Sequence, residues 1–491
     1  MEPTSDFSTA WTAAEFKRVG YQVIDLIADY LNSLADGPVF RPVPLSLAEK
    51  FLTMAAPVDG TDPDSILAEF RETVAPFPLG NGHPRFWGWV NSPPVMIGIL
   101  AEALATAMNP SCAGGNHAAS YVERQVLNWF KEMLGFPADS MGLLVSGGSM
   151  ASLTALAVAR HAKAGFDVRR QGLQGIERKL LLYLSEEGHG CMRKAAELMG
   201  LGSEHIRLVA VDDILRMRVD DLHTRIAADL TDGYQPFAVG ASAGTVNTGA
   251  IDPLGEIAEV CRRYGLWFHV DGAYGAPAIL TKAYQEELAA IALADSVALD
   301  PHKWLSIPVE AGVVLVKDAP AMRDTFSLVP PYLRTDGNLA GVGGLPWFSE
   351  YGFQQTRGFR ALKIWMALKH YGLSGYARMI EEHIALAGYL HRRVTAAPNL
   401  EAMAPPGLSI VCFRYVPATL CGDAARLDAL NKALLERIQL GGRAFLSSTV
   451  LRGAFVLRAC IINYQTRRAD LDFLVELVQQ EGGALEREMD G

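Results

Sequence analysis

A lysine stands at the end of an apolar stretch, in the segment LDPHKWL at residues 299–305. Burying an unpaired ammonium is costly, so Lys303 either reaches water or has a chemical task. Desolvation favours the uncharged, nucleophilic amine, and such a lysine can form a Schiff base with an aldehyde. Asp300 and His302 precede it in the same segment.

Two further polar residues follow apolar runs. Asp271 ends the segment WFHVD, and its carboxylate needs a cation or a ring N–H as a partner. A structural salt bridge would meet the same need. His189 lies in EEGHGCM, between an apolar run and a helical pattern. A histidine at such a place is more often a hydrogen-bonding residue than a catalyst.

The segment at residues 146–162, SGGSMASLTALAVARHA, begins with glycines and continues as a good helix former. Free N–H groups at the start of a helix bind anions, and glycine lets a phosphate approach the backbone closely. Gly147, Gly148 and Ser149 are therefore candidates for a phosphate site, although an ordinary turn that needs glycine would look the same. The sequence contains neither a GxGxxG fingerprint nor a P-loop GK dipeptide.

A hydrolase is a competing hypothesis. The segment GASAG at residues 240–244 matches the G-x-S-x-G nucleophile elbow, and Ser242, Asp271 and His302 follow in the order of the α/β-hydrolase triad. The elbow requires a strand, a sharp turn and a helix, whereas TVNTGAIDP follows here and offers no early helix start. The Ser242 hydrolase is therefore a remote alternative.

Pyridoxal phosphate would account for these residues together, because it combines a phosphate, an aromatic ring and an aldehyde. Lys303 would form the Schiff base, and the turn at residues 147–149 would hold the phosphate. Asp271 would face the pyridine nitrogen and keep the ring protonated, so that the ring can accept electrons. His189 would stack on the ring.

These residues need a scaffold that brings them to one edge. Between residues 142 and 317, short β-branched runs alternate with segments of helical period, which predicts an α/β fold around a mostly parallel sheet. Sites in such folds gather at the carboxyl ends of the strands. Asp252 and Pro253 predict the start of a connecting helix, and Gly265 predicts its end. The expected strands are GLLVS, KLLLYLS, IRLVAV, PFAVGAS, WFHVDG, DSVALD and AGVVLV.

The remaining segments suggest three domains. Apolar residues recur every three or four positions over residues 14–34, which predicts an amphipathic helix, and a proline-rich stretch follows it. We expect an N-terminal helical arm over residues 1–85, a large domain over 86–360 and a small C-terminal α+β domain over 361–491.

Composition narrows the class of partner. The 491 residues carry a net charge of −10, which argues against nucleic acid and anionic membranes and favours a small molecule. Six scattered cysteines suggest neither a disulfide framework nor a metal site, and they fit a cytoplasmic setting. We expect no signal peptide and no membrane span.

With these motifs the chain resembles the pyridoxal-phosphate-dependent group II amino-acid decarboxylases, and within them the aromatic-L-amino-acid decarboxylases. The most specific element is HVDGAYG, followed 32 residues after Asp271 by Lys303 in DPHKWL. The resemblance implies an aspartate aminotransferase-like type I fold and a homodimer with shared sites and an exchanged N-terminal arm. It also implies that Ala273 lies against the cofactor ring, and that His302 lies beside cofactor and substrate.

The resemblance suggests further roles. Tyr332, in VPPYLR, would lie on a closing loop and protonate the carbanion left when carbon dioxide departs. Related aldehyde synthases often have another residue at this position. The family often has Asn in place of Asp300 and a Thr-Thr pair in place of Thr245 and Val246. Further candidates are Thr245 and Asn247 for the cofactor, and Trp87, Ser92 and Thr356 for the substrate, with Phe86 and Trp89 nearby.

The implied reaction is decarboxylation of an aromatic L-amino acid, and the bulk of Thr356 favours a phenyl or phenol side chain over an indole. Three alternatives remain open. A decarboxylase of glutamate or cysteine sulfinate would share the cofactor residues but would need a cation for the substrate side chain. An aldehyde synthase would release peroxide and ammonia. A binding protein without activity would not require a lysine at the cofactor aldehyde.

Overall fold

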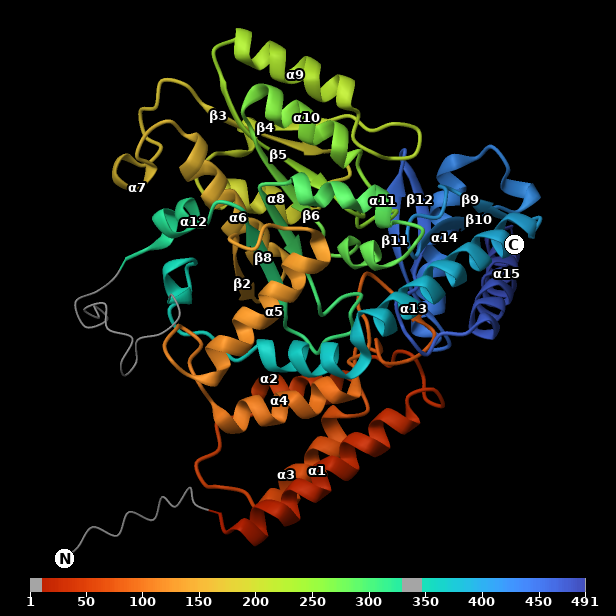
Figure 1. Cartoon of the computed structure of the whole chain (residues 1–491). Helices are drawn as coiled ribbons and strands as arrows, with labels where there is room; N and C mark the ends of the chain where they lie inside the picture. The colour runs from red at the N-terminus through yellow and green to blue at the C-terminus, as the bar shows by residue number, and fades with distance from the viewer. Residues whose placement is uncertain (1–10, 329–346, 491) are drawn as a thin grey trace, which may run out of the picture.

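The computed structural model describes residues 11–328 and 347–490. A seven-stranded sheet forms its centre, with the strand order β2-β8-β7-β6-β5-β3-β4 (Figure 1). Strand β8 runs antiparallel to both neighbours, and the other neighbouring strands are parallel. All seven expected strands form, which confirms the mostly parallel α/β sheet. They are β2 Met141–Val145, β3 Leu180–Ser185, β4 Ile206–Val209, β5 Gln235–Ser242, β6 Trp267–Asp271, β7 Ser296–Leu299 and β8 Gly312–Val316.

Helices between the strands pack on this sheet and carry the connections. Helix α6 contacts β2 and β5 to β8, whereas α9 contacts β4 and β5 and α10 contacts β5 and β6. Every residue of β2, β3, β6, β7 and β8 is buried, as expected for a sheet covered by helices. The helices are α5 Ala118–Leu134, α6 Gly148–Lys163, α7 Val168–Gln171, α8 Gly190–Leu198, α9 Val219–Thr231, α10 Leu254–Tyr264, α11 Gln285–Leu288 and α12 Ala319–Phe326.

The start of α10 differs from the prediction. Pro253 rather than Asp252 is the N-cap residue, and the helix ends before Gly265 as expected, with Gly265 at φ 68°. The Asp252 carboxylate turns inward and accepts hydrogen bonds from the backbone N–H groups of Ser242 and Met217, each at 2.7 Å. Burial raises the pKa of Asp252 to about 6. The Asp252 side chain therefore makes tertiary hydrogen bonds instead of capping the helix.

A second sheet of five strands has the order β1-β11-β12-β10-β9. Its first strand comes from far upstream, because Phe86 and Trp87 pair in parallel with β11. The expected large domain began at residue 86, but these two residues lie in the second sheet. The strands are β1 Phe86–Trp87, β9 Leu400–Ala402, β10 Ile410–Tyr415, β11 Phe445–Leu451 and β12 Ala454–Cys460, with α14 Ala424–Leu440 and α15 Arg468–Asp490 packed together beside them.

Helix α13, Ala361–Ala396, connects the two sheets and is interrupted at Gly372, which has φ 64°. It contacts α4 and α5 on one side and α15, β9 and β10 on the other. The N-terminal helices are α1 Ala13–Ser33, α2 Leu45–Thr53, α3 Pro63–Glu69 and α4 Met96–Met108. The predicted amphipathic helix is present as α1, although Val19 is its only buried residue. Among the described helices, none is long and apolar enough to cross a membrane.

Candidate active site

A cavity of about 550 Å³ opens at the carboxyl ends of the central strands. Strands β2, β5, β6 and β7 each end in residues that line it or directly precede lining residues. This is the edge at which α/β folds place their ligands. The lining residues are Trp89, Val90, Asn91, Ser146, Gly147, Gly148, Ser149, Met150, His189, Cys191, Ser242, Gly244, Thr245, Val246, Asp271, Ala273, Tyr274, Asp300, His302, Lys303, Val309 and Glu310.

The structure brings most of the predicted cofactor residues to this cavity. Ten of them line it, although they come from segments spread over more than 150 positions: Gly147, Gly148, Ser149, His189, Thr245, Asp271, Ala273, Asp300, His302 and Lys303. Tyr332 lies outside the described residues. Trp87, Ser92, Asn247 and Thr356 do not line the cavity.

Lys303 follows β7 on a tight turn, in which its backbone N–H donates to the carbonyl oxygen of Asp300 at 2.9 Å. Its Nζ lies 3.0 Å from Asp300 Oδ2, and 24% of its side chain is exposed to the cavity. Burial lowers the pKa of Lys303, but the charges of Asp300 and Asp271 outweigh burial and raise the pKa above its usual value. The expectation that desolvation keeps this amine uncharged is therefore wrong for the chain on its own.

Asp271 ends β6 opposite Ser242 of β5. Its Oδ1 accepts a hydrogen bond from the backbone N–H of Ala273 at 3.1 Å, which fixes the carboxylate beside the cavity. The residue is 8% exposed. A buried carboxylate with one backbone donor has acceptor capacity left, which suits a ring N–H of a ligand.

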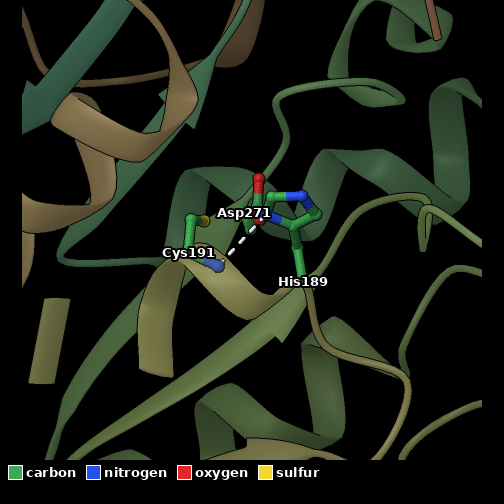
Figure 2. Close-up of side chains that lie close together, drawn as sticks. All are labelled: His189, Cys191 and Asp271. Carbon is green, nitrogen blue, oxygen red and sulfur yellow. Dashed lines mark hydrogen bonds between the residues drawn. The ribbon is translucent and has the colours of Figure 1, made fainter. Parts of the chain in front are cut away.

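His189 caps the start of α8, where its Nδ1 accepts a hydrogen bond from the backbone N–H of Cys191 at 3.2 Å (Figure 2). Ligand atoms of His189, Cys191 and Asp271 lie within 4.8 Å of one another, close enough to suggest a metal site. Burial, reinforced by the charge of Asp271, raises the pKa of the Cys191 thiol to about 12. Nδ1 of His189 is therefore engaged by the backbone, and the raised thiol pKa keeps Cys191 mostly protonated near pH 7 in the absence of a metal.

The phosphate turn lies at the start of α6, with Gly147 as the N-cap and Gly148 as the first helical residue. A Cβ atom on Gly148 would lie 2.9 Å from Asp300 Oδ2 and 3.0 Å from the Ala273 Cβ. Glycine is therefore required here by close packing, and the backbone stays open to a ligand. The residues present fit pyridoxal phosphate, because a glycine turn, a buried acid and a lysine share one cavity.

Trp304 anchors the lysine segment to the rest of the molecule. It is fully buried, its Nε1 donates to His383 Nδ1 of α13 at 3.0 Å, and its ring stacks on Tyr274 with 4.9 Å between centroids. Burial lowers the pKa of His383 to about 4, so its ring is a neutral acceptor near pH 7. The Tyr274 hydroxyl in turn contacts Ser409 Oγ near β10 at 2.6 Å. The segment that carries Lys303 is thus fixed through Trp304 by contacts with α13 and, by way of Tyr274, with Ser409.

Trp87 is not a pocket residue, which corrects the prediction. It is fully buried among the side chains of the second sheet and its helices. Residues two apart in a regular strand face the same side, but β1 ends at Trp87 and the backbone turns at Trp89, which has a positive φ of 48°, so the two rings face different surroundings. Trp89 lines the cavity instead, with 47% of its surface exposed.

Two of the other three misplaced candidates have structural partners, and the third is exposed. Asn247 donates to Glu187 at 2.9 Å and accepts from Thr449 at 2.8 Å, which links the two sheets. Ser92 donates to the carbonyl oxygen of His302 at 3.2 Å and so supports a cavity residue from behind. Thr356 is exposed outside the cavity, so the inference drawn from its bulk has no support in the described residues.

The geometry rules out the Ser242 hydrolase. Strand β5 continues into a loop in which Ala243 bridges Ile251, and the next helix begins only at Leu254. The nucleophile elbow is therefore missing. His302 Nδ1 lies 2.6 Å from the carbonyl oxygen of Ala311 and is engaged there.

Sequence reasoning missed several lining residues, among them Cys191, Val309 and Glu310. The position of Cys191, two residues after His189 at a helix start, was a usable signal. Val309 and Glu310 lie in the irregular link between β7 and β8, where no periodic pattern predicts which side chains face the site.

Comparisons with known proteins agree with this site. Residues 44–416 match the family model described as the pyridoxal-dependent decarboxylase conserved domain. An aromatic-L-amino-acid decarboxylase of Bacillus atrophaeus is 36% identical over 462 residues, which cover 94% of each chain. Tryptophan decarboxylase 2 of Oryza sativa subsp. japonica is 29% identical, over 96% of this chain and 95% of its own.

Two solved structures are similar over nearly the whole length. Oryza sativa TDC, crystallised with PLP and tryptamine, superposes with a TM-score of 0.90 at 25% identity, covering 97% of this chain and 99% of that one. Mouse CSAD superposes with a TM-score of 0.89 at 27% identity, covering 96% and 99%. These likenesses confirm the expected type I fold.

Proposed function

The chain belongs to the pyridoxal-dependent decarboxylase family, and we propose that it converts an aromatic L-amino acid to the corresponding amine and carbon dioxide. Pyridoxal phosphate is its cofactor, as in the family and in the rice structure solved with PLP. The observation that carries the choice of substrate is the lining of the cavity beyond Lys303.

Within the described part of the chain, that lining offers apolar surface and neither an arginine nor a second lysine to pair with an acidic side chain. Trp89, Val246 and Val309 supply aromatic and branched surface. Among the described lining residues there is no arginine and no lysine other than Lys303, and Glu310 adds a negative charge. A glutamate-like side chain would be desolvated here without a partner, whereas an aromatic ring would replace water with favourable contacts.

The cofactor, when bound, supplies an electron sink for the bond broken at the substrate α-carbon. Asp271 would hold a proton on the pyridine nitrogen through its buried carboxylate. Gly147, Gly148 and Ser149 would bind the phosphate through the open start of α6, and His189 would cover one face of the ring. Lys303 would hold the cofactor aldehyde and later release the product amine.

Tyr332 is proposed as the donor of the proton that replaces the lost carboxylate. The support is its position in VPPYLR, 29 residues after Lys303, together with the identity of the family. Tyr332→Phe tests this role, because loss of the donor should divert the reaction toward aldehyde and peroxide while cofactor binding remains normal.

A substrate panel tests the proposed reaction. The purified protein is incubated with phenylalanine, tyrosine, DOPA, tryptophan, glutamate and cysteine sulfinate, and amine, aldehyde, carbon dioxide and peroxide are measured together. We expect amine and carbon dioxide in equal amounts from at least one aromatic substrate. Peroxide equal to aldehyde would indicate an aldehyde synthase, and turnover of glutamate or cysteine sulfinate alone would refute the aromatic proposal.

We further propose that the protein is a homodimer. The support is apolar surface without a partner in the single chain, on α1 and α4. Helix α4 exposes four apolar residues spaced four apart, Met96, Leu100, Leu104 and Met108, each about half exposed, and α1 exposes Phe16, Tyr21 and Ile24. Apolar surface of this extent is typical of protein interfaces.

A cytoplasmic setting also remains our proposal. The support is that all six cysteines carry free thiols, five of them buried. Free thiols are typical of reducing compartments. Fractionation of the producing cells, with activity measured in each fraction, tests this setting.

A further inference from the structure

Asp300 is a buried carboxylate in which only one of the two oxygens has a close partner among the described residues. The residue is 2% exposed, and its Oδ2 lies 3.0 Å from Lys303 Nζ. Its Oδ1 is buried and has no hydrogen-bond partner among the described residues. An unpaired buried carboxylate oxygen is costly, which indicates that something else completes this contact.

The free side of Asp300 faces the phosphate turn. The distance between this carboxylate and the glycines can be given by the place of an added Cβ atom. A Cβ atom on Gly148 would lie 2.9 Å from Asp300 Oδ2, and a Cβ atom on Gly147 would lie 3.8 Å from Asp300 Oδ1. The carboxylate therefore borders the space at the start of α6 where the cofactor phosphate would bind. A carboxylate and a phosphate dianion that shared this space would repel each other unless a proton lay between them.

The charged and titratable groups around Asp300 are few. Lys303 and His302 come from its own turn, with His302 Nε2 at 3.8 Å from Oδ2. Asp271 and Cys191 act on the same lysine from β6 and α8. From α6 the carboxylate meets only glycine backbone and the positive end of the helix. Lys303 is therefore the one close proton donor among the described residues.

Two obstacles to loading the cofactor thus meet at one pair of residues. The Lys303 amine holds a proton that it must lose before it can attack an aldehyde. A carboxylate at the position of Asp300 can face a phosphate dianion only with a proton between them. A transfer between Nζ and Oδ2, which are already in contact, would remove both obstacles.

We propose that Asp300 takes a proton from Lys303 when the cofactor binds and then shares this proton with the cofactor phosphate. Of the three ammonium hydrogens, one moves to Asp300. Lys303 bonds its nitrogen to the aldehyde carbon, and the other two hydrogens leave with the aldehyde oxygen as water. No proton passes to the solvent in this exchange. The proposal rests on the proposed cofactor.

Calorimetry in buffers of different protonation enthalpy counts the protons released on binding. The full-length protein freed of cofactor is titrated at pH 8 with pyridoxal 5′-phosphate and, separately, with pyridoxal, which lacks the phosphate. The wild type should release about one proton fewer with pyridoxal 5′-phosphate than with pyridoxal, because only the phosphate retains the proton on Asp300. Equal release with the two probes would overturn the proposal.

The isosteric variant Asp300→Asn provides the matched comparison. It has no carboxylate to hold the proton, so its release should be the same with pyridoxal 5′-phosphate as with pyridoxal, whatever the protonation of Lys303 before binding. If the difference between the two probes were as large in the variant as in the wild type, the proposal would also be overturned. If neither probe bound to the wild type and no visible absorbance band developed, the cofactor assignment itself would fail, which is a distinct result.

Discussion

Two tryptophans two positions apart have different environments, and their substitution should separate binding from stability. Trp89→Ala removes half-exposed aromatic surface from the cavity, so KM for the aromatic substrate should rise roughly five- to tenfold. Trp87→Ala removes a fully buried ring from the second core and should lower the free energy of unfolding by about 3–5 kcal/mol. Steady-state kinetics and urea unfolding of both variants measure the contrast.

The opposite pattern would show that the pocket is assigned wrongly. Trp87→Ala with normal stability and a raised KM would return Trp87 to the substrate pocket. Trp89→Ala with unchanged KM would mean that the aromatic substrate lies elsewhere, since Trp89 is the most exposed aromatic residue of the described lining.

Asp271 should contribute to catalysis through its charge rather than its shape. Asp271→Asn keeps the side-chain volume and the acceptor for the Ala273 N–H, but it removes the negative charge at the ring nitrogen. We expect kcat to fall on the order of 10²–10³-fold, the usual effect of removing one electrostatic partner of a transition state. A kcat within threefold of the wild type, with cofactor bound, would contradict this role.

At the scale of the elements, the contact between Trp304 and α13 should make the protein sensitive to acid. Burial lowers the pKa of His383 and of His269 to about 4, from an ordinary value of 6.5. Between pH 6.5 and about pH 4 these two histidines are mostly protonated in the unfolded chain and mostly neutral in the folded chain. The stability contributed by these histidines is therefore fully present above pH 6.5 and is lost as the pH falls toward 4.

Urea midpoints between pH 7.5 and 4.5 measure this loss, and His383→Gln isolates one contribution. Glutamine keeps an acceptor oxygen for Trp304 Nε1 but does not titrate. The variant should lose less stability than the wild type over the same pH range. An unchanged slope would mean that His383 is not buried in its neutral form.

A buried ion pair ties α5 to the segment before α13. Arg357 and Glu123 are 3% and 0% exposed, and Arg357 also donates to the carbonyl oxygens of Cys112 and Leu144 at 2.8 and 2.6 Å. Glu123→Gln leaves the guanidinium buried without its counter-charge and should destabilise the fold by about 3–5 kcal/mol. Thermal unfolding measures the effect.

An exposed pair supplies the matched control. Glu259→Gln breaks the contact with Arg262, in which both side chains are more than 60% exposed, and should lower the stability far less than Glu123→Gln does. If both variants were equally stable, the Glu123–Arg357 pair would not contribute to the stability of the fold.

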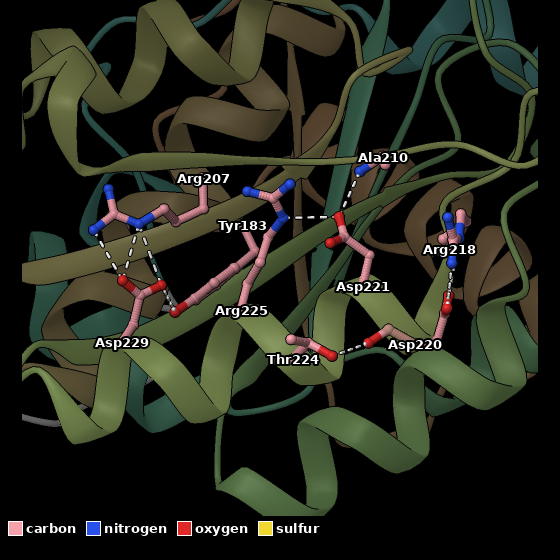
Figure 3. Close-up of polar contacts among 9 residues, drawn as sticks. All are labelled: Tyr183, Arg207, Ala210, Arg218, Asp220, Asp221, Thr224, Arg225 and Asp229. Atoms are coloured by element: carbon pink, nitrogen blue, oxygen red, sulfur yellow. Dashed lines mark hydrogen bonds and ion pairs between the residues drawn. The ribbon is translucent and has the colours of Figure 1, made fainter.

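The central sheet was predictable because its strands are short β-branched runs between helical segments. Its last strand, β4, lies at the edge and is held by contacts that no periodicity indicates. Arg207 of β4 and the Tyr183 hydroxyl of β3 both donate to Asp229 of α9, at 2.9 and 2.8 Å (Figure 3). Pairings of this kind join residues distant in sequence, and single-sequence patterns carry no information about them.

The residues of the site also fall into predictable and unpredictable groups. Residues that directly follow predicted strands, such as Asp271 and Lys303, were located because the ends of parallel strands meet at one edge. Residues in irregular segments were not, since Asn247 and Thr356 depend on how the loops fold back. The two-residue strand at Trp87 is too short to show an alternation, and the direction of its side chain could not be predicted.

At the scale of the whole molecule, the two sheets meet beside the cavity through Arg458 of β12. Its guanidinium donates to the carbonyl oxygens of Trp89 and Asn247, at 2.8 and 3.1 Å. One buried side chain thus fixes a cavity residue and the loop after β5 at the same time. The position of Trp89 depends on the second sheet, even though the chemistry takes place at the first.

The apolar stripe of α4 leads to the last prediction, which concerns assembly. Leu104 lies inside this stripe and is 53% exposed in the single chain, so a lysine there costs little in the monomer but would bury a charge in an interface. Leu104→Lys should therefore lower the molar mass in solution from that of a dimer to the 53.2 kDa of one chain, measured by light scattering after gel filtration. Leu198→Lys, at an exposed leucine at the end of α8, is the control and should leave the mass unchanged.

If Leu104→Lys kept the dimer mass, α4 would not lie in the interface, and a wild type of monomer mass would refute the homodimer. We propose that the two copies share the sites, as the family resemblance implies, so the monomeric variant should also lose activity while its single-chain unfolding midpoint stays near that of the control.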